Sequence, residues 1–133
     1  MPEIPIERGE LKDRTKTFGL RAIKLAAHLP KNMTACVLGK QLIRCATSVG
    51  ANYRSACRGR SRAEFASKIG IVLEEVDEAA YWLELIIESN TMSEAKCASL
   101  LREANELSAI FFTALGTIRS FSPTSPKRQL RQS

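Results

Sequence analysis

The sequence predicts an all-α protein, an antiparallel up-down-up-down four-helix bundle. Apolar residues recur at spacings of three and four in four long stretches, which is the period of an amphipathic helix. Only a few helix-breaking residues separate one stretch from the next, and connections this short place neighbouring helices antiparallel. The chain shows neither the alternation of a β-strand nor an internal repeat.

The first two helices are expected at residues 10–29 and 33–58. The first ends before Pro30, because the residue that precedes a proline is pushed out of the helical region. The second ends before Gly59, which we expect to cap it in the left-handed conformation.

The third and fourth helices are expected at residues 62–89 and 93–120. Ser61 and Glu64 have the spacing of a capping box, which opens the third helix. The polar run at 89–91 ends that helix and leads into the fourth.

The chain of 133 residues is long enough to bury one core. We expect a single bundle at 1–121 and a flexible basic tail at 122–133, because Pro123 and Pro126 end helical structure. No apolar run approaches the ~18 residues of a membrane span. The first residues lack the layout of a signal peptide, so the cytoplasm is the expected location.

The net charge of +6 is distributed unevenly. Residues 1–62 hold thirteen lysines and arginines against four acidic residues, a net +9. Residues 63–121 hold four against ten, a net −6, and the last twelve residues add +3. Such asymmetry is typical of chains that bind nucleic acid or another anionic surface. The alternative is that the two halves attract each other within the fold.

Positive side chains follow one side of the second predicted helix. At about 100° per residue they fall within an arc of roughly 80°, and the apolar residues occupy the opposite arc. The basic residues are Lys40, Arg44, Arg54, Arg58 and Arg62, of which Arg62 is expected in the first turn of the third helix, close to the end of the row. The apolar residues are Leu38, Leu42, Cys45, Ala46, Val49, Tyr53, Ala56 and Cys57. Such a helix buries one side in a core and presents guanidinium groups to an anionic partner.

Some apolar residues lie on the outward sides of the predicted first and third helices. A group of this kind on a soluble protein usually marks a partner surface, so we expect self-association through it. The alternative is a loose bundle with a wide core. The residues expected at the oligomer interface are Leu20, Ile23, Ile71, Trp82 and Leu85.

The residues indicate neither an enzyme nor a cofactor. The single histidine, His28, lacks the glutamate partner of a di-iron bundle, and no phosphate-binding loop or zinc helix is present. Acidic residues on one edge of the third helix could bind Mg²⁺, but ion pairs are the favoured interpretation. The acids are Asp77, Glu84 and Glu88, with Arg14, Arg21 or Arg54 as expected partners. The cysteines at 36, 45, 57 and 97 are expected to be reduced thiols.

Several blocks of the sequence resemble the 23S ribosomal-RNA intervening-sequence protein family. They are RTKTFGLRAIKL at 14–25, LGKQLIR at 38–44, TSVGANYR at 47–54, RGRSRAEF at 58–65 and EAAYWLE at 78–84. The resemblance implies a small bacterial four-helix bundle that forms a ring-shaped homopentamer. Some members are encoded within insertions in 23S rRNA genes. A related branch serves diversity-generating retroelements and binds nucleic acid and a reverse transcriptase. The resemblance carries over no catalytic residues.

The sequence therefore predicts a non-catalytic, oligomeric nucleic-acid-binding protein, with structured RNA as the expected ligand. Because no aromatic residues interleave the basic residues, recognition by charge and shape is expected, without base stacking. The alternative is a protein-interaction scaffold that docks an acidic partner or a reverse transcriptase.

Overall fold

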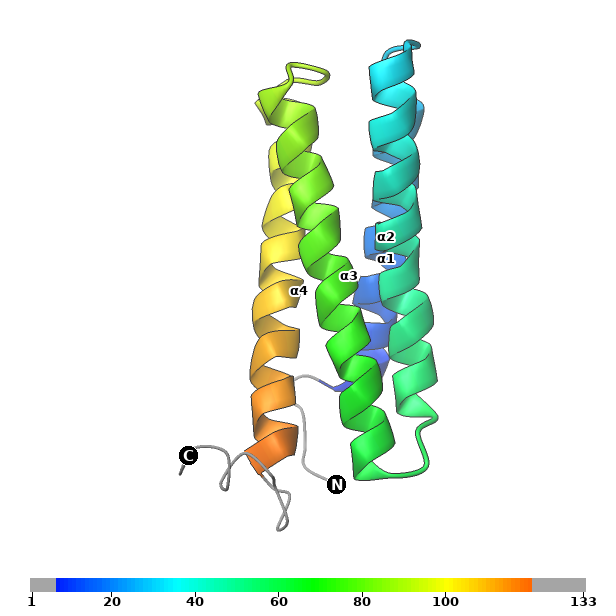
Figure 1. Ribbon diagram of the computed structural model, residues 1–133, viewed down its shortest axis with the longest axis vertical. Helices are drawn as coiled ribbons and strands as arrows, with labels where there is room; N and C mark the ends of the chain where they lie inside the picture. The colour runs from blue at the N-terminus through cyan, green and yellow to red at the C-terminus, as the bar shows by residue number, and fades with distance from the viewer. Residues whose placement is uncertain (1–6, 121–133) are drawn as a thin grey trace, which may run out of the picture.

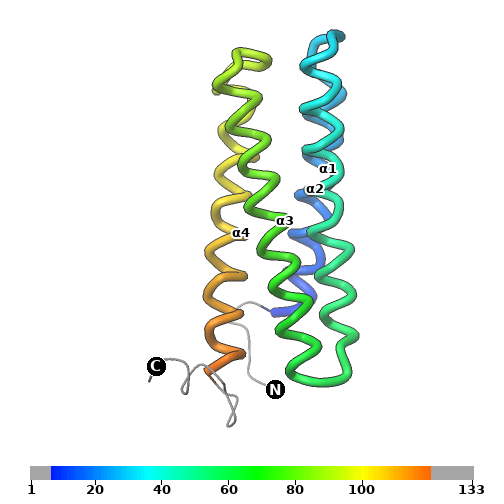
Figure 2. The backbone as a smooth tube through the Cα atoms, in the orientation of Figure 1, coloured from blue at the N-terminus to red at the C-terminus, as the bar shows by residue number. Residues whose placement is uncertain are grey.

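The computed structural model describes residues 7–120, which form four long helices (Figure 1). They are α1 (Arg8–Ala27), α2 (Met33–Cys57), α3 (Arg62–Glu88) and α4 (Glu94–Ser120). The α1–α2 and α3–α4 connections lie at one end and the α2–α3 connection at the other, so neighbouring helices are antiparallel (Figure 2). The predicted all-α bundle is confirmed. The expected basic tail at 122–133 lies outside the described residues.

Side-chain caps explain where α2 and α3 begin. The Asn32 side-chain oxygen accepts a hydrogen bond from the Ala35 amide at 2.8 Å, which satisfies one unpaired N–H of the first turn. The Ser61 hydroxyl accepts from the Glu64 amide at 3.0 Å. The Glu64 carboxylate in turn accepts from the Arg60 amide at 3.0 Å. The expected capping pair therefore forms, with the glutamate reaching one residue further back than usual.

Gly59 does not adopt the left-handed conformation that we expected. Within residues 7–120 the only positive φ belongs to Asn90, at 60°, in the turn between α3 and α4. The position instead favours glycine because the neighbouring backbone leaves little room for a side chain. A Cβ there would lie 3.0 Å from the Ala56 carbonyl oxygen and 3.3 Å from the Phe65 nitrogen. The glycine therefore lets the α2–α3 turn pack directly against the start of α3.

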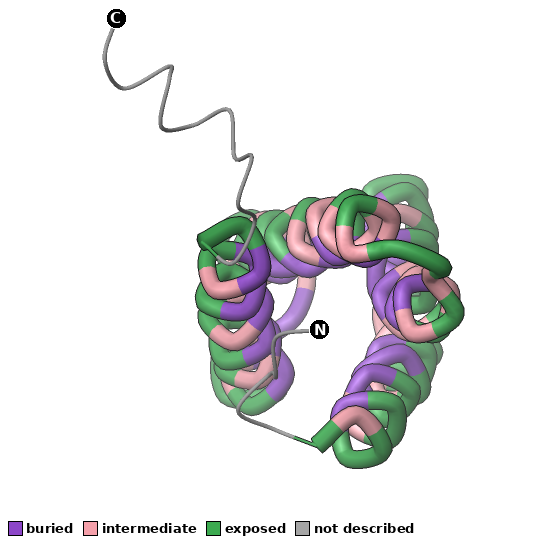
Figure 3. Tube along the Cα trace, turned by 90° about the horizontal axis from the view of Figure 1, so that it is seen from below, coloured by how far each residue is buried: buried purple, intermediate pink, exposed green. Residues whose placement is uncertain are grey.

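The core lies along the axis of the bundle, where buried residues line the inner side of every helix (Figure 3). Tyr53, Phe18, Phe65 and Phe111 are the largest fully buried side chains, and the Tyr53 and Phe111 rings lie 5.5 Å apart. The predicted apolar arc of α2 is buried, with Cys57 at its edge only partly covered. Within residues 7–120 no helix has an apolar stretch long enough to cross a membrane.

Each helix packs against the next one along the chain, and the contact that closes the circle, between α1 and α4, is the smallest. The backbones of α1 and α2 approach each other closely at two glycines. A Cβ on Gly50 would lie 3.3 Å from the Thr15 carbonyl oxygen, and one on Gly19 would lie 3.5 Å from that of Ala46. Thr15 is itself buried, and its hydroxyl donates to the Leu11 carbonyl at 2.8 Å. Glycine at these crossings sets the distance between the two helices.

We predict opposite effects of alanine at two helical glycines. Gly116→Ala should raise the free energy of unfolding by about 0.5–1 kcal/mol, because nothing lies within 4 Å and alanine is the better helix former. Gly50→Ala should lower it, because the new methyl group meets the backbone of α1. Denaturant unfolding of both variants measures this difference. Equal stabilisation by both substitutions would show that the α1–α2 spacing is not tight.

Candidate nucleic-acid interface

The outer side of α2 presents cations over much of its length. Lys40, Arg54 and Arg58 are exposed, and they span about 27 Å at 1.5 Å per residue. Arg60, in the connection to α3, is also exposed. None of the ion pairs within residues 7–120 involves any of these four side chains. We call Lys40, Arg54, Arg58 and Arg60 the α2 basic row.

Arg44, which we expected to belong to this row, binds α3 instead. One guanidinium nitrogen donates a short hydrogen bond to the Glu78 carboxylate, and another lies 3.8 Å from a Glu75 oxygen. The Arg44 side chain is still half exposed. Its charge is therefore largely balanced by its neighbours, and its main contacts are structural.

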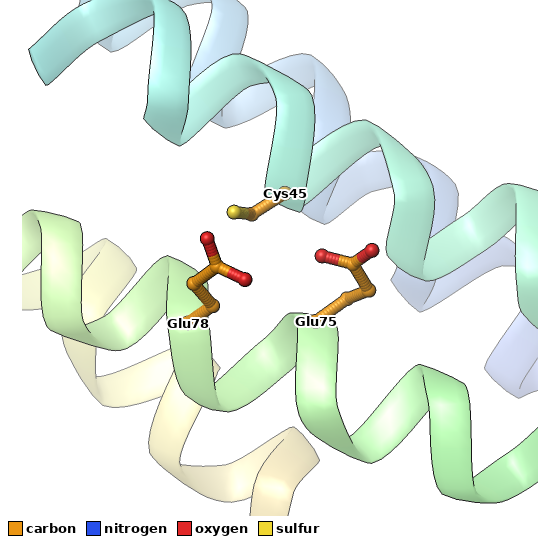
Figure 4. A group of neighbouring side chains, drawn as sticks. All are labelled: Cys45, Glu75 and Glu78. Carbon is orange, nitrogen blue, oxygen red and sulfur yellow. The ribbon is translucent and has the colours of Figure 1, made fainter.

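Beside this ion pair, the Cys45 thiol of α2 faces Glu75 and Glu78 of α3 (Figure 4). One ligand-type atom from each of the three residues lies within 4.8 Å of the others. Burial raises the pKa of the Cys45 thiol to about 12, and the Glu78 carboxylate adds to the rise. Hydrogen bonds from the Trp82 indole and the Cys45 thiol lower the pKa of the Glu78 carboxyl. The thiol is thus protonated at neutral pH, and Arg44 already supplies a positive charge to both carboxylates.

Arg62 lies in the first turn of α3, as expected, but its side chain is less exposed than the α2 basic row. α2 ends at Cys57 and Arg62 is the first residue of α3, so an angle extrapolated from α2 does not apply to it. Its side chain is partly buried, unlike those of the α2 basic row. We therefore leave Arg62 out of the candidate interface.

The ion pairs that we expected for Asp77, Glu84 and Glu88 do not form within residues 7–120, so this prediction is wrong. Asp77 accepts a hydrogen bond from the Ser108 hydroxyl at 2.6 Å. Of the arginines expected as partners, Arg14 forms its ion pairs across the α1–α4 seam instead, where it binds Glu103 through two nitrogens at 2.7 and 3.0 Å. Arg14 also lies 3.3 Å from Glu106. Arg21 donates to the Ser99 hydroxyl at 2.7 Å.

Charge differs sharply between the helices. α1 carries six basic and two acidic residues, and α2 carries three basic residues and no acidic one. α3 carries two basic and seven acidic residues, and α4 three of each. The bundle thus has a positive α1–α2 hairpin and a negative α3. Opposite charges on two faces of one molecule favour contact with a second copy as well as attraction within the bundle.

Two of the expected interface residues are well exposed on α1. Leu20 and Ile23 are 57% and 44% exposed, and they line a small groove between α1 and α2. The groove encloses about 200 Å³ and is bounded by Gly19, Lys16 and Thr47 as well, with Thr15 at its base. Ile71, on α3, is 37% exposed. These three large apolar side chains remain candidates for contact with a partner.

The other two expected interface residues do not project from the bundle. Trp82 and Leu85 are partly buried and pack against the core. The Trp82 indole donates to Glu78 at 3.3 Å, and the same Glu78 carboxylate accepts from Arg44 of α2. The expected outward position was wrong because α3 packs against both α2 and α4, so its buried arc is wider than the single stripe that we assumed.

Other exposed apolar residues were missed by the sequence analysis. Tyr81, 51% exposed, contacts the Trp82 ring edge-on at a centroid distance of 5.3 Å. Phe112 on α4 is 70% exposed, and Met33 and Val37 on α2 are 81% and 52% exposed. Met33 and Val37 lie on the same arc of α2 as the basic residues, so extending that arc toward the start of the helix would have found them.

A comparison with protein-family models matches residues 8–113 to the 23S rRNA-intervening sequence protein family. The chain belongs to this family. The match covers most of the bundle and so includes both the α2 basic row and the α1–α2 groove.

A solved structure agrees with this assignment. The chain resembles a Bacteroides thetaiotaomicron protein with unknown function from the S23 ribosomal protein family. The TM-score is 0.77 at 31% sequence identity, over 84% of this chain and all of that one. A comparison with curated proteins found no match.

We predict that the thiols differ strongly in reactivity. With a disulfide reagent at pH 8, Cys36 should react fast because it is exposed. Cys45 and Cys97 should react only when the protein unfolds, because burial raises the pKa of both thiols. Absorbance of the released thiolate measures the phases, and Cys36→Ser should remove the fast one. A fast phase that persists in Cys36→Ser and titrates two thiols would contradict this assignment.

Proposed function

We propose that the protein is a non-catalytic, oligomeric nucleic-acid-binding protein whose ligand is structured RNA. The observation that carries this proposal is the α2 basic row, which is exposed and takes no part in the ion pairs of residues 7–120. Phosphates are the groups that such a row binds best, because arginine forms paired hydrogen bonds with them. The family, named for intervening sequences of 23S rRNA, supports RNA as the class of ligand.

The expected mode of recognition is contact with the phosphate backbone. The exposed aromatic rings, Tyr81 and Phe112, lie on α3 and α4 rather than beside the α2 basic row. Stacking on unpaired bases is therefore not the expected source of affinity. A row about 27 Å long fits successive phosphates of a helical or folded RNA, which is recognised by shape and charge.

We predict that salt weakens RNA binding steeply through the α2 basic row. Each phosphate contact on a duplex adds about 0.9 to the slope of log affinity against log salt, so four contacts per subunit give about −3 to −4. Lys40→Gln/Arg54→Gln/Arg58→Gln should flatten the slope to about −1 while the helical circular dichroism stays unchanged. Glutamine is chosen because a glutamate at the end of α2 would itself oppose the helix dipole.

A matched control removes three charges elsewhere. Lys12, Lys31 and Arg102 are all exposed and lie outside the α2 basic row, so their triple glutamine variant should keep most of the parent slope.

Competition with polyglutamate tests the alternative, an acidic protein ligand. If polyglutamate competes with RNA at equal charge concentration, an acidic protein partner replaces RNA as the best proposal. If both triple variants lose RNA affinity and salt slope equally, the assignment of RNA binding to the α2 basic row is wrong.

We also propose that self-association uses the α1–α2 groove. Its apolar lining, Leu20 and Ile23, lies on the positive hairpin, while Ile71 and Tyr81 are exposed on the negative α3. These two faces are complementary in charge and both carry apolar side chains. Contact between unlike faces of successive copies is heterologous, and it closes into a ring when the rotation permits. Five subunits are the expected number by resemblance.

We predict that Leu20→Glu/Ile23→Glu gives a folded but smaller species, because the proposed contact gains unpaired charges. Phe112→Glu is the matched control, since Phe112 is more exposed than either residue and lies on α4. Native mass spectrometry of all three proteins measures the number of subunits. A parent that is monomeric at about 50 μM, well above the concentrations at which specific complexes form, contradicts the proposal.

A further inference from the structure

A second basic feature lies in the seam between α1 and α4, away from the residues of the α2 basic row. There, a cavity of about 300 Å³ opens between the last turns of α1 and the first turns of α4. Its lining residues are Arg21, Lys24, Leu25, His28, Met92, Lys96, Ser99 and Leu100. The volume is at the lower end of the range in which proteins hold small ligands, about 300–1,000 Å³.

The charge of this cavity is entirely positive. Arg21, Lys24 and Lys96 are permanent cations, and none of the eight lining residues is acidic. Nearer the start of α1, the charge of the same seam is balanced, because Arg14 forms ion pairs with Glu103 and Glu106. One and two helical turns from Glu103, toward the start of α4, this helix offers Ser99 and Lys96 in place of carboxylates. The cavity therefore lacks a counterion among its own walls, and an anion would supply it.

Hydrogen bonds already hold two of the polar groups in place. The Arg21 guanidinium donates to the Ser99 hydroxyl oxygen at 2.7 Å, which leaves the hydroxyl hydrogen free to donate to a ligand. His28 Nδ1 lies 2.8 Å from the Lys24 carbonyl oxygen. Because a carbonyl only accepts, Nδ1 carries the proton, and Nε2 is the ring nitrogen that remains for a ligand.

The base of the cavity is apolar. Leu100 and Met92 are 3% and 9% exposed and belong to the core, and the half-buried Leu25 packs against the same core. A fully hydrated inorganic ion would leave this surface uncovered. The cavity instead suits a ligand that combines an anionic group with a flat or compact body, because such a body covers apolar carbon while the cations bind the charge.

We propose that this cavity binds a nucleotide as its phosphomonoester. Arg21, Lys24 and Lys96 bind the phosphate, and the base lies over Leu25, Met92 and Leu100. Three permanent cations match a dianionic phosphate better than a single carboxylate, and the Arg21 fork matches its geometry. The proposal does not rest on RNA binding by the α2 basic row, because it uses α1 and α4 alone.

Calorimetric titration with AMP, adenosine and inorganic phosphate tests the proposal. AMP should bind at least about tenfold more tightly than either of the others, because it alone uses both the cations and the apolar base. Lys24→Ala/Lys96→Ala should weaken AMP binding by about tenfold or more. The control, Lys12→Ala/Arg102→Ala, removes one exposed charge from each of the same two helices and should match the parent. Arg21 is left unchanged because it also joins α1 to α4.

A short oligoadenylate with and without a 5′-phosphate separates the two sources of the ligand. A preference for the phosphorylated strand that is lost in Lys24→Ala/Lys96→Ala identifies an RNA end, and AMP binding without that preference identifies a free nucleotide. Either result supports the proposal. Equal binding of AMP and adenosine, equal binding of AMP and phosphate, or equal losses in the two double variants would overturn it. Lys40→Gln/Arg54→Gln/Arg58→Gln should bind AMP as the parent does, because none of its residues lines the cavity, so failure here is distinct from failure of the α2 proposal.

Discussion

The double packing of α2 is the constraint on which the rest of the structure depends. This helix contacts α1 on one side and α3 on the other, and its apolar arc is buried between them. On the α1 side the approach is set by glycine, since a side chain at Gly50 would meet the backbone at Thr15. Because α2 packs against two neighbouring helices and the core, its rotation about its own axis is fixed. Its remaining side must face outward, and that is the side on which Lys40, Arg54 and Arg58 are placed.

Separation of charge between the helices follows from the same arrangement. The positive α1–α2 hairpin meets the negative α3 along one helix contact, and only Arg44 among the described residues of α2 forms ion pairs across it. The Arg44–Glu75–Glu78 group closes over the Cys45 thiol, so it protects a core position as well as joining two helices. The α2 basic row forms no such ion pair with the residues that the structure describes. An unbalanced row on a rigid helix is preorganised for phosphates, since little ordering of the backbone is needed on binding.

The sequence was sufficient for the fold and for the buried side of α2, because both depend on local periodicity and on breaks such as Pro30. It was not sufficient where a position depends on which helices are neighbours. Trp82 was expected to face outward but is partly buried and packs against the core, and the carboxylates that bind Arg14 lie on α4 rather than on α3. Arg62 begins α3 as expected, but the helical arc of α2 did not show that its side chain is partly buried there. Periodicity does not reveal the register between helices, and that register decides each of these contacts.

The most direct test of the account is to locate bound RNA on the protein. Ultraviolet cross-linking of the full chain to a structured RNA, followed by mass spectrometry of the cross-linked peptides, reports the contacted residues without altering any of them. The account predicts that the cross-links concentrate between residues 40 and 60, on the outer side of α2 and the connection to α3. Cross-links concentrated on α3 or on the second half of α4, with residues 40–60 unmarked, would contradict the claim that α2 binds the RNA.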